Sequence, residues 1–123
     1  MDTSMKSYLA ELLGTFTLVF LGGLSVVAVT LAPFSAGGNV VIPALAHGLA
    51  LLAIAFVYGG ISGAHVNPAI TISLLLGGKI DAVKGGVYIV MQVIGALIAA
   101  VVIEAILPDG NAGQATGGIT SSN

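Results

Sequence analysis

Two long runs without a charged residue constrain what this chain can fold into more than any other feature. No Asp, Glu, Lys or Arg occurs between Glu11 and Lys79, and none occurs from Gly85 to Ile103. A helix that crosses a bilayer needs about 20 apolar residues, because the hydrocarbon core is about 30 Å thick. The first run therefore holds roughly two membrane spans plus additional sequence, and the second run holds one.

The hydrophobic pattern predicts spans at about residues 7–31, 42–59 and 83–107. Turn-forming residues at 32–39 predict a loop after the first span. The first apolar stretch is longer than the 7–15 residues typical of a signal-peptide core, so we expect it to remain as a span. We take residues 1–109 as one folded unit and expect a loop or flexible tail at 110–123, where residues are small, polar and uncharged.

A short apolar segment between the second and third spans predicts a helix that does not cross the membrane. Asn67 is a good helix N-cap, Pro68 is favoured at the first helical position, and paired glycines at 77–78 suit a helix end. A helix over 68–76 would be about 15 Å long, roughly half of the hydrocarbon core. Its low charge argues against a helix lying on the membrane surface, so we expect a re-entrant segment.

The three lysines predict the orientation. Lys6 precedes the first span, and Lys79 and Lys84 lie between the second and third spans. By the positive-inside rule, the N-terminus and the 60–84 segment are expected in the cytoplasm.

Pairs of small residues at helical spacing are expected to let helices pack closely. These pairs are Ala10/Gly14, Gly59/Gly63 and Gly95/Ala99.

Four motifs in order along the chain resemble the first half of the aquaporin, or major intrinsic protein, family. They are "AELLGT" (10–15), "ALAHGLA" (44–50), "SGAHVNPAIT" (62–71) and "YIVMQVIGA" (88–96). The resemblance extends over about residues 6–108 and covers the first of the family's two repeats. It implies an all-α membrane protein with three transmembrane helices and one re-entrant half-helix, which is half of the six-helix fold.

The resemblance places the pore motif at Asn67, Pro68 and Ala69. The Asn67 amide oxygen can cap the short helix while its NH2 group remains free to donate to a solute. The helix N-terminus adds a partial positive charge that disfavours cations. Backbone carbonyls of the lead-in are expected to form a ladder of acceptors; they belong to Gly63, Ala64, His65 and Val66.

The remaining site residues are implied by the resemblance. His47 corresponds to a selectivity-filter position, the alternative being a histidine hydrogen-bonded inside the bundle. Glu11 and Gln92 are expected to support the re-entrant loop, and the His65 side chain to hold it by hydrogen bonds. Apolar pore-wall positions fall at Leu18, Leu51 and Ile70, although such residues in a span more often face lipid or neighbouring helices.

Other functional classes are disfavoured. A net charge of −2 without a basic patch argues against nucleic acid, and the chain has no cysteine. The acidic residues fall at different depths without a paired acid and base, so we do not expect an enzyme. His47 and His65 lack the spacing of metal ligands, and we expect neither a metal nor a cofactor.

We therefore expect a passive channel component, embedded in membrane lipid, for water and other small neutral solutes such as glycerol, ammonia, urea or peroxide. The second pore motif and the filter arginine of the family are absent, so a second half is needed to enclose a pore. It would be a separate chain, a C-terminal portion of a longer protein, or an inverted copy. The resemblance implies tetramers. The alternative is a non-conducting membrane assembly or regulatory protein with the same half fold.

Overall fold

The structure is a computed structural model that describes residues 2–31 and 40–107. These residues form four helices: α1 (Thr3–Leu31), α2 (Val41–Ser62), α3 (Pro68–Leu76) and α4 (Ala82–Ile106). Helices α1, α2 and α4 are long and apolar enough to cross a membrane, whereas α3 has only 9 residues. The predicted fold class is confirmed. The loop expected at 32–39 and the tail expected at 110–123 lie outside the described residues.

The helices extend somewhat beyond the spans expected from hydrophobicity. Helix α1 begins at Thr3 rather than near residue 7, because a polar first turn continues a helix without being apolar. Helix α2 continues to Ser62 rather than ending near 59. It stops there because Gly63 adopts a left-handed conformation, with φ of 91°, and its N–H bonds to the Gly59 carbonyl. Hydrophobicity indicates the lipid-facing length of a helix, whereas capping sets its ends.

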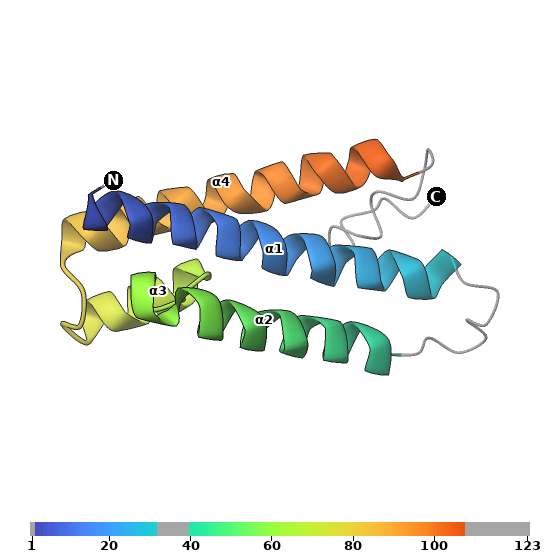
Figure 1. Ribbon diagram of the computed structural model, residues 1–123, viewed down its shortest axis with the longest axis horizontal. Helices are drawn as coiled ribbons and strands as arrows, with labels where there is room; N and C mark the ends of the chain where they lie inside the picture. The colour runs from blue at the N-terminus through green and yellow to red at the C-terminus, as the bar shows by residue number, and fades with distance from the viewer. Residues whose placement is uncertain (1, 32–39, 108–123) are drawn as a thin grey trace.

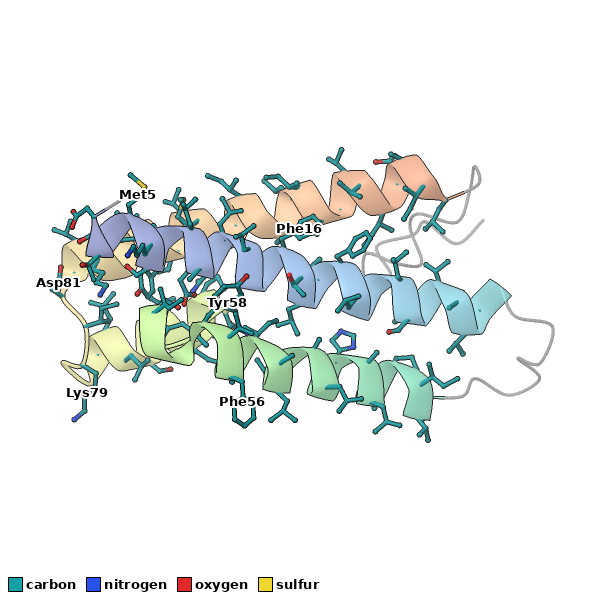
Figure 2. The ribbon with its side chains drawn as sticks, in the orientation of Figure 1. Met5, Phe16, Phe56, Tyr58, Lys79 and Asp81 are labelled. Carbon is teal, nitrogen blue, oxygen red and sulfur yellow. The ribbon has the colours of Figure 1, made fainter. Side chains whose placement is uncertain are left out.

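Helix α1 is the central element of the bundle (Figure 1). It packs against α4 on one side and α2 on the other, and α3 packs against α4. The start of the chain lies at the same end of the molecule as the turn between α3 and α4. Figure 2 shows Lys79 and Asp81 at that end, and Phe56 pointing away from the other helices.

Two of the glycines expected to pack closely lie at tight contacts. A Cβ on Gly95 of α4 would overlap the Leu12 carbonyl oxygen of α1 and lie 3.1 Å from the Phe16 nitrogen. Gly95 therefore brings the backbones of α4 and α1 together as expected. A Cβ on Gly14 of α1 would lie 2.5 Å from Cγ1 of Val66, so Gly14 leaves room for that side chain.

No described residue packs on Gly59, where a Cβ would meet nothing within 4 Å. Gly63 ends α2 in the left-handed conformation, and a Cβ on it would lie 3.3 Å from Cδ2 and Nε2 of the His65 ring.

The bundle interior changes character along its length. Toward the C-terminal end of α1 and α4, Val27 and Ile103 are buried together, with partly buried Phe20, Leu24 and Leu107 around them. Nearer the N-terminal ends of these helices lie the six buried polar or charged side chains of the described residues: Ser7, Glu11, Thr15, His65, Thr71 and Gln92. Buried polar groups are expensive unless they are hydrogen-bonded, so this second region is the candidate functional site.

Candidate functional site

The segment that joins α2 to α3 has an unusual backbone. Gly63, Ala64 and Val66 have φ values of 91°, 48° and 40°. Positive φ is uncommon for a residue with a Cβ and is a genuine outlier for a β-branched residue such as Val66. Each such residue costs on the order of 1–3 kcal/mol, so surrounding contacts must hold it in place.

Glu11 of α1 supplies most of those contacts. Its Oε1 accepts hydrogen bonds from the Ser62 hydroxyl at 2.6 Å and the His65 backbone N–H at 3.0 Å. Its Oε2 accepts from the Val66 backbone N–H at 2.7 Å and from Gln92 Nε2 at 2.7 Å. The side chain is fully buried. An ionised carboxylate is an acceptor-only group with about four lone-pair sites, so its hydrogen-bonding capacity is used in full.

Thr71 of α3 forms a second centre of the network. Its hydroxyl accepts from Gln92 Nε2 at 2.9 Å and donates to the Asn67 carbonyl at 3.2 Å. His65 Nδ1 lies 3.1 Å from the Thr71 hydroxyl oxygen. A hydroxyl has one proton to donate, and here the Asn67 carbonyl takes it. His65 therefore donates from Nδ1, and Gln92 connects Glu11 to the short helix.

Tyr88 of α4 contacts the segment that joins α2 to α3. Its hydroxyl donates to the Ser62 carbonyl at 2.9 Å. Its fully buried ring makes edge contacts with His65, at 5.1 Å between ring centroids, and with Tyr8, at 6.1 Å. An edge-to-face arrangement suits the aromatic quadrupole. The loop is thus clamped between α1 and α4 by polar and aromatic contacts.

Asn67 begins α3. Its Oδ1 accepts from the Ala69 backbone N–H at 2.8 Å, and Pro68 follows at the first helical position. Among the hydrogen bonds of residues 2–31 and 40–107, none uses the Asn67 NH2 group, and the residue is exposed. The cap therefore occupies the oxygen and leaves two N–H donors free.

The carbonyls of the lead-in are also free of partners within the described part of the chain. No hydrogen bond there ends on the backbone oxygens of Gly63, Ala64, His65 or Val66. A backbone carbonyl without a partner is rare in a protein interior. Four carbonyls in succession, directly before Asn67 in the chain, therefore remain available as acceptors.

The position of the site along the bundle follows from helix geometry. Glu11 lies eight residues after Thr3, and Gln92 lies ten residues after Ala82. At 1.5 Å per residue these positions are about 12 and 15 Å from the helix starts.

The structure brings together some of the predicted site residues and not others. Glu11, Gln92 and the lead-in, including His65 and Val66, share one network. His47 is not part of it. His47 is exposed on α2, and its Nδ1 lies 2.8 Å from the Pro43 carbonyl. Among the predicted wall residues, Leu18 is half-buried, and Leu51 and Ile70 are exposed.

Three network residues were not predicted from the sequence. They are Ser62, Thr71 and Tyr88. Two of them carry a usable signal, because residues four apart share a helix face. Thr71 follows Asn67 by four residues, and Tyr88 precedes Gln92 by four. Ser62 had no such signal, because its role depends on where α2 ends.

The residues that the structure describes contain no group of three or more His, Cys, Asp or Glu side chains that could hold a metal ion. We therefore describe the site by its hydrogen-bonding groups.

Two buried polar atoms in this region have no hydrogen-bond partner among the described residues, Thr15 Oγ1 and Gln92 Oε1. Replacing Thr15 with Val is therefore expected to leave stability unchanged or raise it by about 1 kcal/mol, because the hydroxyl is desolvated without a bond in return. The thermal unfolding midpoint in detergent, followed by circular dichroism, measures this.

Thr17→Val is the matched control for Thr15→Val. The Thr17 hydroxyl donates to the Leu13 carbonyl at 2.8 Å in an exposed position, so its removal is expected to change little or to destabilise slightly. A loss of more than about 1 kcal/mol in Thr15→Val would mean that the hydroxyl has a partner.

Comparison with known proteins shows the family to which the chain is related. The model of a family described as "Major intrinsic protein" matches residues 1–122. The chain is 46% identical over 100 residues to "Glycerol uptake facilitator protein-like 6" of Lactiplantibacillus plantarum, covering 81% of this chain and 43% of that protein. It is 46% identical over 102 residues to "Aquaporin Z" of Photorhabdus laumondii, covering 83% of this chain and 44% of that protein. It is 39% identical over 105 residues to "Probable aquaporin TIP2-2" of Oryza sativa, covering 82% of this chain and 42% of that protein.

The chain therefore spans less than half the length of these curated relatives. With three helices long enough to span a bilayer, the matches identify an integral, multi-pass membrane protein.

Proposed function

Because the chain belongs to the major intrinsic protein family, we propose that it forms one half of a passive channel for water and other small neutral solutes. It would work by hydrogen bonding and shape, without a catalytic step. Glycerol is a candidate alongside water, since one of the similar proteins is named as a glycerol uptake facilitator and two are named as aquaporins.

The observation that carries this proposal is the hydrogen-bonding state of the loop. The Asn67 NH2 group is free and exposed, and the four preceding carbonyls have no partner among the described residues. A single file of water needs acceptors along its path and a donor that orients its oxygen. The N-terminus of α3 adds about half a positive elementary charge at the same point, which opposes the entry of cations.

A second half is part of the proposal because this loop needs cover. Within the described residues, α3 packs against α4 and not against α2. Large apolar side chains on α2 and α3 are exposed, including Leu49 and Phe56 of α2 and Ile72 and Leu76 of α3. Irregular backbone at membrane depth is tolerated only when protein or a water-filled cavity surrounds it. The partner would be a separate chain, the remainder of a longer protein or an inverted copy, and the complete channels would assemble as tetramers.

We also propose that the N-terminus is cytoplasmic. Lys79 and the start of the chain lie at the same end of the molecule. Lys6 and Lys84 are close in sequence to these two points. The positive-inside rule then assigns this end to the cytoplasm.

Asn67→Asp tests the channel. Asp caps a helix as well as Asn does, so α3 should still form, but the variant loses both N–H donors and adds a negative charge. We expect water permeability to fall by at least about fivefold, the factor equivalent to one lost hydrogen bond of about 1 kcal/mol. The measurement is stopped-flow light scattering of proteoliposomes that contain this chain with the second repeat of the similar aquaporin Z.

Two comparisons make the test decisive. Ser73→Ala on the same helix is the matched control, because its exposed hydroxyl bonds only to the Ala69 carbonyl, and it should conduct normally. The chain alone should give the permeability of lipid if another sequence supplies the second half, and should conduct if an inverted copy supplies it. If the assembled wild type also stays at the lipid background, the protein is a non-conducting assembly partner instead; if the chain alone conducts, a separate second half is unnecessary.

A further inference from the structure

Gly14 of α1 lies where the side chain of Val66 enters the helix bundle. A Cβ on Gly14 would lie 2.5 Å from Cγ1 of Val66, a separation that real Cβ atoms essentially never show. Gly14 is buried, and Val66 is 3% exposed. The Val66 side chain therefore occupies space that exists because residue 14 has no side chain of its own.

The Val66 side chain has little room to turn away from an added methyl group. Valine is β-branched and stiff about χ1. The same Cβ position on Gly14 lies 3.3 Å from Cγ2 of Ile54 and 3.5 Å from Cδ2 of Tyr58, both on α2. Ile54 is itself buried. A larger residue at position 14 is therefore expected to displace the backbone of Val66.

The same face of α1 also holds Val66 by its backbone. Oε2 of Glu11 accepts from the Val66 N–H at 2.7 Å. Glu11 precedes Gly14 by three residues, which places the two on one side of the helix. Val66 has a φ of 40°, which is an outlier for a β-branched residue. The carboxylate on its N–H and the space for its side chain together hold this conformation against α1.

The peptide bond between Val66 and Asn67 would respond to displacement of the Val66 side chain. The Val66 N–H is fixed on Glu11, so movement of the side chain turns the backbone that follows. That backbone carries the Val66 carbonyl, which has no partner among the described residues, and it leads directly into Asn67 at the start of α3.

We propose that Gly14 is a positioning residue of the channel. By receiving the Val66 side chain, it fixes the direction of the Val66 carbonyl and, through the next peptide, that of the Asn67 amide. The inference rests on the proposed channel function, in which these two groups meet the solute. In this role Gly14 acts through Val66 and not by contact with the solute.

Gly14→Ala tests this inference in proteoliposomes that contain the chain with the second repeat of the similar aquaporin Z. We expect water permeability to fall by at least about fivefold, as for the loss of one hydrogen bond. Gly86→Ala is the matched control, because residue 86 is also a glycine of a long apolar helix and a Cβ there meets nothing within 4 Å. It should conduct as the wild type does. An equal loss in both variants overturns the inference.

The Val66→Ala background isolates the mechanism. It removes the Cγ atom that the new methyl group would meet, so Gly14→Ala should lower permeability there by less than about twofold, because the two sites are coupled. The double variant should also conduct better than Gly14→Ala, and should fold even if Gly14→Ala does not. A drop of the same factor in both backgrounds, or a double variant that does not fold, overturns the inference, since the effect would then arise from packing of α1 against α2.

NMR of the full chain in detergent gives a readout that does not depend on conduction. Val66 and Asn67 are the one valine–asparagine pair in the sequence. Labelling valine carbonyls with carbon-13 and asparagine with nitrogen-15 therefore gives one carbonyl-to-amide signal, which reports on this peptide alone. Gly14→Ala should shift the signal and Gly86→Ala should leave it in place.

The absence of a shift in Gly14→Ala overturns the inference, as does an equal shift in Gly86→Ala. If no assembly conducts, the channel proposal fails, and this signal alone decides whether Gly14 positions the Val66 carbonyl.

Discussion

Glu11→Gln is expected to release the loop and abolish conduction, although the substitution exchanges one oxygen for an NH2 group of the same size. Each carboxylate oxygen accepts two hydrogen bonds, from Ser62 and His65 or from Val66 and Gln92. If NH2 replaces Oε2, the Val66 N–H and the Gln92 NH2 group lose their acceptor; if it replaces Oε1, the His65 N–H loses its acceptor, while the Ser62 hydroxyl can turn and accept. A buried polar group left without a partner costs about 1–3 kcal/mol.

The expected loss of about 1–6 kcal/mol is a substantial share of the 5–15 kcal/mol that stabilises a typical protein. It also removes the contacts that hold Ala64 and Val66 at positive φ, so the loop should relax before the bundle unfolds. Amide hydrogen exchange measures this: the His65 and Val66 N–H groups should lose protection in Glu11→Gln more than those of α1.

Glu104→Gln is the matched control. It makes the same chemical change, and Glu104 is exposed on α4, away from the network. It should leave exchange, the unfolding midpoint and permeability unchanged. Wild-type protection and permeability in Glu11→Gln would show that the carboxylate does not hold the loop.

Gly95→Ala and Gly86→Ala are expected to change stability in opposite directions, although both replace a glycine of α4. A Cβ on Gly95 would overlap the Leu12 carbonyl of α1. Backbone atoms cannot turn aside, so the two helices must separate, and overpacking of this kind costs about 1–3 kcal/mol. A Cβ on Gly86 meets nothing within 4 Å, and alanine favours the helix by up to about 1 kcal/mol.

The Gly95 variant should also weaken the site. Gln92 lies one turn before Gly95 and reaches Glu11 across the same contact between α1 and α4. Separating the helices lengthens that bond and the one from Gln92 to Thr71. Unfolding midpoints in detergent, together with permeability, measure both effects. A change of the same sign in the two variants would contradict the close approach of α4 to α1.

Much of the fold was predictable because it depends on local chemistry. The bounds of α3 follow from Asn67, Pro68 and the glycines at 77–78, which act within a few residues of one another. The three spans follow from runs of apolar residues that only a membrane or a large core can accommodate. Spacing shows which residues share a helix face but not which helix covers that face, and no described residue packs on Gly59.

The site was predictable only in part, for the same reason. Glu11 and Gln92 were singled out by resemblance to a family, not by any local pattern. Nothing near Ser62 in the sequence indicates that its hydroxyl meets a carboxylate 51 residues away. Nor does any pattern of the chain indicate that Val66 adopts a positive φ.

By itself the sequence determined an apolar chain with three spans and a capped half-length helix, because helix capping and burial in lipid act through neighbouring residues and total apolar length. Only the tertiary structure decided that Glu11 accepts hydrogen bonds from Ser62, His65, Val66 and Gln92. Those features join residues 51 to 81 positions apart. The strained loop is stable only because the packing of α1 against α4 brings these donors and acceptors together.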